Sequence, residues 1–280
     1  MRMQAFRELS AGNVAVSTTA PEYALLDEGL AHCISRASEA LRAEQSPEGY
    51  WSYEFEADCT IPAEYILMTH FMDEVDEALE AKIAVYIRSK QGRDDGWALY
   101  PGGELDLSCT VKAYYALKLA GDSPDAPHMR RARAAILARG GAANANVFTK
   151  IALALFGQIP WRGVPFIPVE IMLLPRWFPF HISKVSYWSR TVMVPLFVLC
   201  TLKPRAANPS GIDVRELFTV APDEENNWFP VRSLLNRVFL LLDRMGRGLH
   251  RLVPPFIRRR AIKKAENWIC LLYTSDAADE

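Results

Sequence analysis

A chain of 280 residues is long enough for one or two domains with a sizeable hydrophobic core. Its composition, 50% hydrophobic and 11% aromatic, excludes an intrinsically disordered protein, and its net charge of −1 gives no reason to expect a nucleic-acid partner. The charge is uneven: residues 44–80 carry eleven acids and no Lys or Arg, whereas residues 232–264 carry ten basic residues and one acid, Asp243.

The chain shows no targeting, membrane-spanning or metal-binding pattern. Residues 1–20 lack an apolar core, so residues 1–24 are expected to be a flexible leader rather than a secretory signal. The longest charge-free apolar run, residues 191–202, is too short to cross a bilayer. Five cysteines without a C-x-x-C pair favour reduced thiols in a cytosolic environment over disulfides or a metal site. No metal or cofactor is expected.

Apolar periodicity and breaks predict a nearly all-helical chain. The expected helices cover residues 25–44, 61–72, 76–90, 108–120, 127–139, 146–157, 168–174, 184–202, 231–252 and 258–270. Five prolines among aromatic residues exclude one long helix between 159 and 179, where an irregular packed segment is expected. Residues 204–222 are typical of a surface loop.

A sequence repeat organises the first half of the chain. Cys59, Thr60 and Ala63 recur as Cys109, Thr110 and Ala113 at an offset of 50, and the turns before them also match. The matched turn residues are Gln45, Gly49 and Trp51 in the first copy and Gln91, Gly96 and Trp97 in the second. The predicted unit is a helical hairpin, whose glycine permits a tight turn and whose indole ties neighbouring units together.

Residues 234–253 predict an amphipathic helix. The apolar positions are Leu235, Val238, Leu242, Met245, Leu249 and Leu252, widened by Phe239, and the arginines at 237, 244 and 251 lie seven apart on another face. Such a helix suits the headgroup region of an anionic leaflet. The alternative is a helix packed on the core, with its arginines facing water. The pattern alone does not choose between them.

Five patches, in order, resemble the bacterial squalene–hopene cyclases. They are the two Gln/Trp repeats, the Tyr-Pro-Gly-Gly turn at 100–103, the Ala-Tyr-Tyr-Ala-Leu helix at 113–117, the Glu-Ile-Met-Leu-Leu run at 170–174, and Ser-Tyr-Trp-Ser-Arg at 186–190. The resemblance implies an all-α fold in which residues 25–269 form an incomplete α/α barrel (toroid) of helical-hairpin repeats. It also implies a monotopic enzyme on the cytoplasmic side of the cell membrane, with residues 231–256 as its membrane-contacting helix.

By the same resemblance, the complete enzyme cyclises squalene to hopene and hopanol through carbocations. The acid that protonates the alkene lies in an Asp-x-Asp-Asp motif in the family, and this chain has none. The nearest approaches are Asp73-Glu-Val-Asp76, which is typical of a helix boundary, and Asp94-Asp95, which belongs to the repeat turn. No catalytic residue is therefore assigned, and the chain alone is expected to be inactive.

The C-terminal residues interrupt a third repeat. Residues 264–269 match residues 82–87, but Tyr273 stands where the repeat predicts a Gln. Residues 270–280 resemble a translated sequencing adapter. We therefore expect them to be a non-native tail, with the natural sequence ending near Ile269.

The resemblance assigns substrate contacts to five residues. Trp188 matches a tryptophan that lines the cavity, and Glu64 matches a glutamate in the polar network at its far end. Val185 and Met193 align with the substrate entrance, and Lys112, which replaces a glutamate of some members, is positioned to balance the charge of Glu64. The alternatives are a core tryptophan joining two helices at 188 and a paired helix carboxylate at 64.

Three classes of function stay open at this point. The first is part of a squalene–hopene cyclase, the second is part of an oxidosqualene-type or other triterpene cyclase, and the third is a non-catalytic α/α scaffold. The pattern does not decide whether the chain forms a homodimer.

Overall fold

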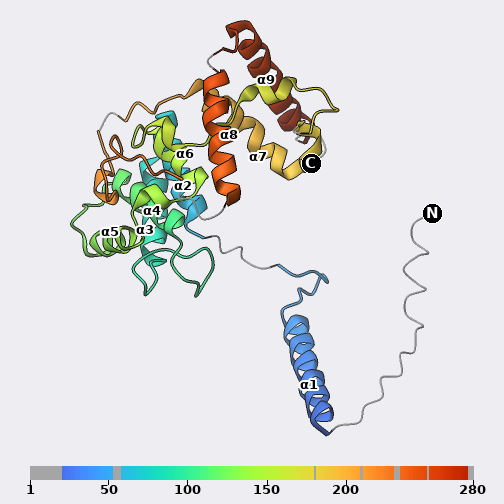
Figure 1. Ribbon diagram of the computed structural model, residues 1–280. Helices are drawn as coiled ribbons and strands as arrows, with labels where there is room; N and C mark the ends of the chain where they lie inside the picture. Colours follow the sequence, from blue (N-terminus) through green and yellow to red (C-terminus); the bar gives the residue numbers. More distant parts are fainter. Residues whose placement is uncertain are drawn as a thin grey trace. The chain divides into compact units, whose positions relative to one another are not determined.

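The computed structural model describes residues 21–52, 58–179, 181–208, 211–229, 234–250 and 252–276 (Figure 1). The chain divides into two compact units, residues 1–56 and residues 57–280. Across the described ranges the regular structure is helical, and a single bridge between Ala98 and Leu105 is the only β pairing there. The predicted all-α class is confirmed.

The first unit contains one described helix, α1 (Pro21–Ala43). The α-helices of the second unit are α2 (Thr60–Met72), α3 (Glu77–Ser89), α4 (Leu107–Leu119), α5 (Pro127–Ala138), α6 (Val147–Leu155), α7 (Tyr187–Leu202), α8 (Leu234–His250) and α9 (Pro255–Asp276). Its short 3₁₀ helices are η1 (Ala142–Asn144), η2 (Trp161–Gly163), η3 (Val169–Leu173), η4 (Ile182–Lys184) and η5 (Arg215–Leu217).

Most expected helices form within a few residues of their predicted bounds, and the exceptions have local causes. The helix expected at 168–174 is the 3₁₀ helix η3, because prolines at 168 and 175 confine it to five residues. Helix α9 starts at Pro255, three residues earlier than expected, since proline is well tolerated at the first helical position. It continues to Asp276, through part of the expected tail; residues 277–280 lie outside the described ranges.

Helix α1 likewise begins inside the expected leader, at Pro21, while residues 1–20 lie outside the described ranges. Its apolar residues Leu30, Ile34 and Leu41 are exposed within the first unit. The expected helix 231–252 is described as α8 from 234 to 250, with residues 231–233 and 251 outside the description.

The indoles of the two repeat turns make the same hydrogen bond. Trp51 Nε1 donates to the carbonyl of Leu41 at 2.6 Å, and Trp97 Nε1 donates to the carbonyl of Ile87 at 2.7 Å. In both copies the acceptor belongs to the helix ten residues earlier, so the indole closes the end of the helix that precedes its turn. The predicted repeat is confirmed at these positions.

The glutamines of the turns also match. Gln45 Nε2 donates to the carbonyl of Gly49 at 2.8 Å, and Gln91 Nε2 donates to the carbonyl of Asp95 at 3.1 Å. Gln91 makes a second bond, to the carbonyl of His128 at 2.9 Å, which ties the turn to the start of α5. Each glutamine therefore satisfies backbone groups of its own turn, as the sequence predicts.

One residue pairing in the turn was wrong. The sequence alignment equates Gly49 with Gly96, but the conformational equivalent of Gly49 (φ 91°) is Asp95 (φ 67°). Both residues adopt the left-handed conformation, which Asp tolerates better than most other residues. Gly96 is small for another reason: a Cβ there would overlap the side chain of Leu105 and lie 2.7 Å from Thr110 Oγ1.

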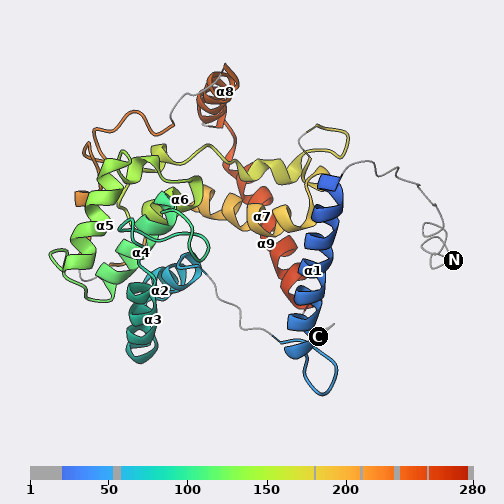
Figure 2. The same cartoon turned by 90° about the horizontal axis from the view of Figure 1, so that it is seen from below.

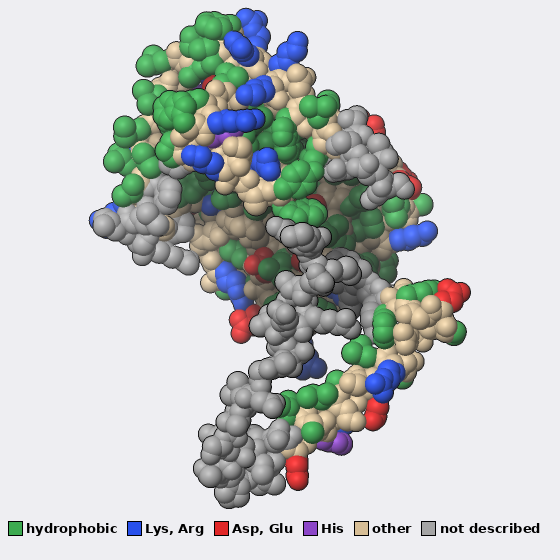
Figure 3. Space-filling model, turned by 90° about the vertical axis from the view of Figure 1, so that its right-hand side faces the viewer, with side chains coloured by type: hydrophobic (Ala, Val, Ile, Leu, Met, Phe, Trp, Pro, Cys, Tyr) green, Lys and Arg blue, Asp and Glu red, His purple; other side chains and the backbone are tan. Residues whose placement is uncertain are grey.

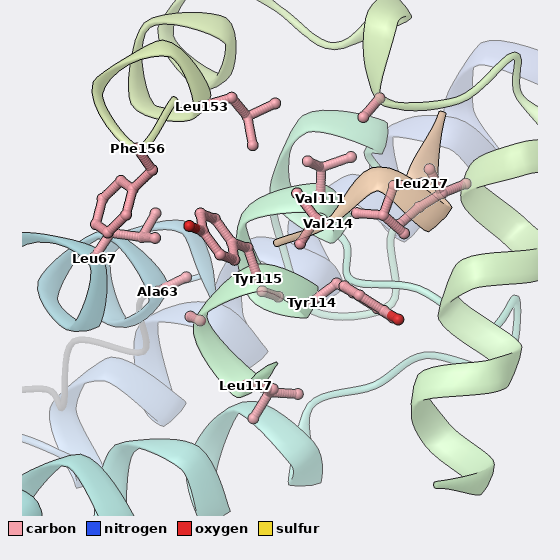
Figure 4. Close-up of a cluster of buried hydrophobic side chains, with 14 of the residues drawn as sticks. Ala63, Leu67, Val111, Tyr114, Tyr115, Leu117, Leu153, Phe156, Val214 and Leu217 are labelled. Atoms are coloured by element: carbon pink, nitrogen blue, oxygen red, sulfur yellow. The ribbon is translucent and has the colours of Figure 1, made fainter. Parts of the chain in front are cut away.

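Helix α4 forms the centre of the second unit. Its residues from Ser108 to Leu117 are buried, and it packs against α2, α3, α5 and α6 (Figure 4). The repeat partners Ala63 and Ala113 are both fully buried where α2 and α4 meet. The central position of α4 explains why apolar residues occur around most of its circumference, while its Lys112 is buried in an ion pair.

A smaller apolar cluster joins η3, α7 and α9, which lie side by side (Figures 1 and 2). Ala261 and Ala265, one turn apart on α9, are completely buried in this cluster, and their small side chains allow close helix packing. Trp268 and Ile269, expected to open a third repeat, pack partly buried against it.

Candidate functional site

The structure brings the predicted polar pair together. Lys112 Nζ lies 2.7 Å from Glu64 Oε1, across the contact between α4 and α2. Lys112 is buried, whereas half of the Glu64 side chain is exposed. Lys112 therefore balances the charge of Glu64, as expected. This pairing also agrees with the alternative interpretation, in which Glu64 is a paired helix carboxylate. A role of this pair in orienting substrate stays a prediction.

The other predicted substrate contacts lie around the start of α7. Trp188 is 81% exposed in this chain, and its place in the cavity of the complete enzyme stays a prediction. Val185 precedes the helix cap Ser186 and is half-buried, and Met193 packs against the cluster of η3, α7 and α9. Because Glu64 and Lys112 belong to the packing of α2 with α4, the two predicted groups lie on different helix clusters.

Helix α8 turns its apolar face outward. The exposed apolar residues are Val238, Leu241, Leu242, Met245 and Leu249, and Arg237 and Arg244 are exposed as well. The side chains of Leu235 and Phe239 lie outside the description. In this chain α8 leaves Leu242, Met245 and Leu249 exposed, and the membrane-contacting role of this face stays a prediction. Figure 3 shows hydrophobic and basic side chains together on one face of the molecule.

Polar side chains fasten α8 to the body. Asp243 Oδ1 accepts a hydrogen bond from the backbone N–H of Phe166 at 2.5 Å. Arg247 pairs with Asp243 at 2.6 Å and donates to the carbonyl of Val164 at 2.5 Å. Gly246 leaves room for the Phe166 ring, since a Cβ there would lie 2.6 Å from it. These contacts explain why the apolar side of the helix faces away from the body.

Two cavities lie beside α8 and meet at Pro165 and Phe166. The basic cavity, of about 310 Å³, is lined by Lys203, Arg247, His250 and Arg258 together with apolar residues. The apolar cavity, of about 490 Å³, is lined mainly by Phe166, Phe229, Leu240 and Leu242. Sequence reasoning missed both. The one available signal was Asp243, the lone acid of the basic run, because an isolated acid among arginines indicates a specific pairing.

Lys150 is a second feature that the sequence did not reveal. It is buried on α6, donates to the carbonyl of Trp228 at 2.5 Å, and lies 5.2 Å from the ring centre of Phe229. Burial lowers the pKa of Lys150 to about 8, and the nearby carboxylate of Glu225 opposes that shift. A buried ammonium with a single carbonyl acceptor is therefore an energetic cost to the fold near neutral pH.

This cost predicts a specific pH dependence. The folded pKa of about 8 lies below the ordinary 10.5, so the unfolded chain binds more protons between these values and stability rises with pH across that window. We compare the free energy of unfolding of the wild type with that of Lys150→Met. Their difference, wild type minus variant, is expected to rise by about 2.6 kcal/mol from pH 8 to 10.5. Urea denaturation at several pH values measures the difference, and a flat difference would contradict it.

The acidic pairs that resemble an Asp-x-Asp-Asp motif have structural roles. Asp73 ends α2 in a left-handed conformation, and Asp76 caps α3 by accepting from the N–H groups of Ala78 and Leu79. In the repeat turn, Asp94 accepts from the backbone of Leu105. The predictions of a helix boundary and of a turn are confirmed.

The thiols at the equivalent repeat positions are buried and protonated. Burial raises the pKa of Cys59 to about 12 and that of Cys109 to about 11. Cys33, Cys59, Cys109 and Cys200 are not in disulfides. Across the described residues, none of the helices combines the length and the apolar character needed to cross a bilayer.

Comparison with known proteins identifies the family. A family model described as the squalene-hopene cyclase N-terminal domain matches residues 34–276. The squalene–hopene cyclase of Bradyrhizobium diazoefficiens is 50% identical over 249 residues, which cover 85% of this chain and 37% of that protein. Those of Zymomonas mobilis and Schizosaccharomyces japonicus are 49% and 48% identical, over 91% and 92% of this chain and 39% of each relative.

This chain thus spans less than two fifths of the length of these relatives. The matched region includes both repeat turns, the Glu64–Lys112 pair, Trp188 and helix α8. The family model matches most of the chain, and about half of the aligned residues are identical in the named members. The chain therefore belongs to the squalene–hopene cyclase family and corresponds to its N-terminal domain.

Proposed function

We propose that this chain supplies the N-terminal part of a squalene–hopene cyclase, a triterpene cyclase that converts squalene to hopene and hopanol. The observation that carries the proposal is the family match over residues 34–276 together with relatives, named for this reaction, that share about half of its residues. The chain has no Asp-x-Asp-Asp motif. The acid that protonates the alkene is therefore assigned to another part of the complete enzyme, and this chain alone is proposed to be inactive.

Within that enzyme, residues 25–269 are proposed to form part of an α/α barrel around the substrate. Trp188 is exposed on α7, so its ring face is free to meet the polyene and to stabilise a cation. Val185 and Met193 are proposed to line the entrance to the same cavity. Glu64, which keeps half of its side chain exposed while paired with Lys112, is proposed to orient water near the last cation.

We also propose that α8 attaches the enzyme to the cytoplasmic leaflet of the cell membrane without crossing it. The support is the exposed apolar face of Leu242, Met245 and Leu249, flanked by the exposed cations Arg237 and Arg244. An apolar face of this kind enters the boundary of the acyl chains, and flanking arginines attract anionic lipids. The unbridged thiols of Cys59, Cys109 and Cys200 support the cytoplasmic side, where cysteines stay reduced.

A chimeric enzyme tests the cyclase proposal. Residues 34–269 would replace the matched segment of the Bradyrhizobium diazoefficiens cyclase, and gas chromatography would follow squalene conversion. We expect hopene and hopanol from the chimera. Trp188→Ala in the chimera is expected to lower turnover roughly thirtyfold, the equivalent of about 2 kcal/mol for a desolvated cation–π contact, with little change in thermal stability.

Trp177→Ala is the matched control, because Trp177 is 76% exposed and has no proposed substrate contact. A folded chimera that leaves squalene unchanged would refute the cyclase proposal. Equal loss of turnover and stability in Trp188→Ala would instead assign Trp188 a structural role.

A further inference from the structure

The basic cavity has more positive charge than its own acids neutralise. Arg247 pairs with Asp243, and Arg258 pairs with Glu170 at 3.3 Å. Lys203 also lines the cavity, and its ammonium has no ion-pair partner among the described residues. Three permanent cations, Lys203, Arg247 and Arg258, thus face two carboxylates, which leaves one net positive charge. An anionic group is the ligand that this balance favours.

The cations are held in place by the fold. His250 Nε2 lies 3.2 Å from Glu170, and Arg258 donates to the backbone carbonyl of His250 at 3.0 Å, which joins the end of α8 to the start of α9. The His250 ring also packs edge-on against Phe166, with 5.1 Å between ring centres. Arg247 is anchored to the backbone at Val164. This rigidity distinguishes the cavity from a set of mobile surface side chains.

The apolar cavity continues from the basic one. Both contain Pro165 and Phe166, and the apolar cavity extends along Phe229 and Leu240 to Leu242. Leu242 is itself 54% exposed and belongs to the outward apolar face of α8. The apolar cavity therefore joins a charged pocket at one end to the face that is proposed to enter the membrane.

We propose that these two cavities form a binding site for a single anionic phospholipid. The phosphate occupies the basic cavity beside Lys203, Arg247 and Arg258, and one acyl chain lies in the apolar cavity along Phe229 and Leu240. Squalene, a hydrocarbon, has no group for the cations, and free phosphate leaves the apolar cavity unfilled. The proposal rests on membrane attachment by α8 and adds a specific lipid to it.

Monomeric short-chain lipids test the site separately from the membrane. The full chain is titrated, by isothermal calorimetry below the critical micelle concentration, with dihexanoylphosphatidylglycerol, with dihexanoylphosphatidylcholine and with inorganic phosphate. We expect saturable 1:1 binding of the phosphatidylglycerol and at least fivefold weaker binding of the other two. Lys203→Gln is expected to weaken the phosphatidylglycerol about fivefold, as loss of one cation near a lipid phosphate does.

Matched variants separate the two halves of the site. Arg260→Gln removes an exposed cation of α9 that does not line the cavity, and it should leave binding unchanged. Leu240→Gln, in the apolar cavity, is expected to weaken binding at least tenfold, whereas the neighbouring exposed Leu241→Gln should not. Circular dichroism would confirm that each variant is folded. Lys203 is exposed, so its variant keeps the test valid if Leu240→Gln unfolds.

The outcomes separate this inference from membrane attachment. Equal binding of the two lipids, or equal losses in Lys203→Gln and Arg260→Gln, would overturn the phospholipid site. Absence of monomer binding with intact vesicle binding would overturn it while leaving attachment by α8 in place. Monomer binding without vesicle binding would uphold the site and refute the attachment.

Discussion

Replacing Trp97 with alanine is expected to lower the free energy of unfolding by about 3–5 kcal/mol, the range for a large aromatic side chain removed from a core. Trp97 is completely buried between α3 and α4, and its indole N–H bonds to the carbonyl of Ile87. The substitution therefore leaves a cavity and removes one of the two hydrogen bonds to the Ile87 carbonyl, which keeps its bond from the Lys90 N–H. Urea denaturation followed by circular dichroism measures the loss.

The first repeat copy provides the control. Trp51 makes the same hydrogen bond, but it is 46% exposed in its unit, so Trp51→Ala is expected to cost much less. Trp97→Phe keeps much of the apolar volume and removes the donor, so its cost is expected to include about 0.5–1.5 kcal/mol for the lost hydrogen bond. If Trp51→Ala and Trp97→Ala were equally destabilising, the contribution of burial would be refuted.

The double substitution Leu242→Glu with Leu249→Glu is expected to weaken binding to phosphatidylglycerol vesicles by at least a hundredfold. Burying one leucine contributes about 1.5–3 kcal/mol, so the pair contributes about 3–6 kcal/mol, and every 1.4 kcal/mol is a tenfold change in affinity. Both residues are more than half exposed on α8, so the substitution should leave the fold intact. Liposome flotation measures the bound fraction.

Two controls test whether the effect is specific to α8 and how much of it is electrostatic. Leu30→Glu with Leu41→Glu makes the same change at exposed leucines of α1 and should leave flotation unchanged. Arg237→Gln with Arg244→Gln removes only the electrostatic part, about 1 kcal/mol per arginine, and its effect should disappear at high salt. Unchanged flotation of the α8 double variant would remove the proposal that this helix attaches the protein to a membrane.

For helix α8, the sequence predicts the helix but not the direction of its apolar face. The spacing of its leucines predicted an amphipathic helix, and this is confirmed, but periodicity does not tell whether an apolar face meets the core or the exterior. Asp243 and Arg247 decide the orientation through backbone partners at Phe166 and Val164, about eighty residues earlier. No local pattern contains that information.

The repeat turn also contains features that the sequence predicts and features that only the folded structure reveals. The hydrogen bonds of Gln91 to Asp95 and of Trp97 to Ile87 were predicted correctly because each joins residues at most ten positions apart. The bond of Gln91 to His128 was not predicted. The matching of Gly49 to Gly96 was wrong because it compared residue types, whereas the left-handed position in the second copy is taken by Asp95. Gly96 is required by the approach of Leu105, which only the folded turn reveals.

The sequence by itself determined the helices and the helical-hairpin repeat, because these depend on short-range periodicity and on positions related by the repeat. Its resemblance to known cyclases gave the family, and the pairing of Glu64 with Lys112 was expected only from that resemblance. Only the tertiary structure decided which face of α8 points outward, where Lys150 is buried, and how Phe166 divides the two cavities. These features arise from contacts between residues tens of positions apart, whose energies depend on burial and geometry that a linear pattern does not carry.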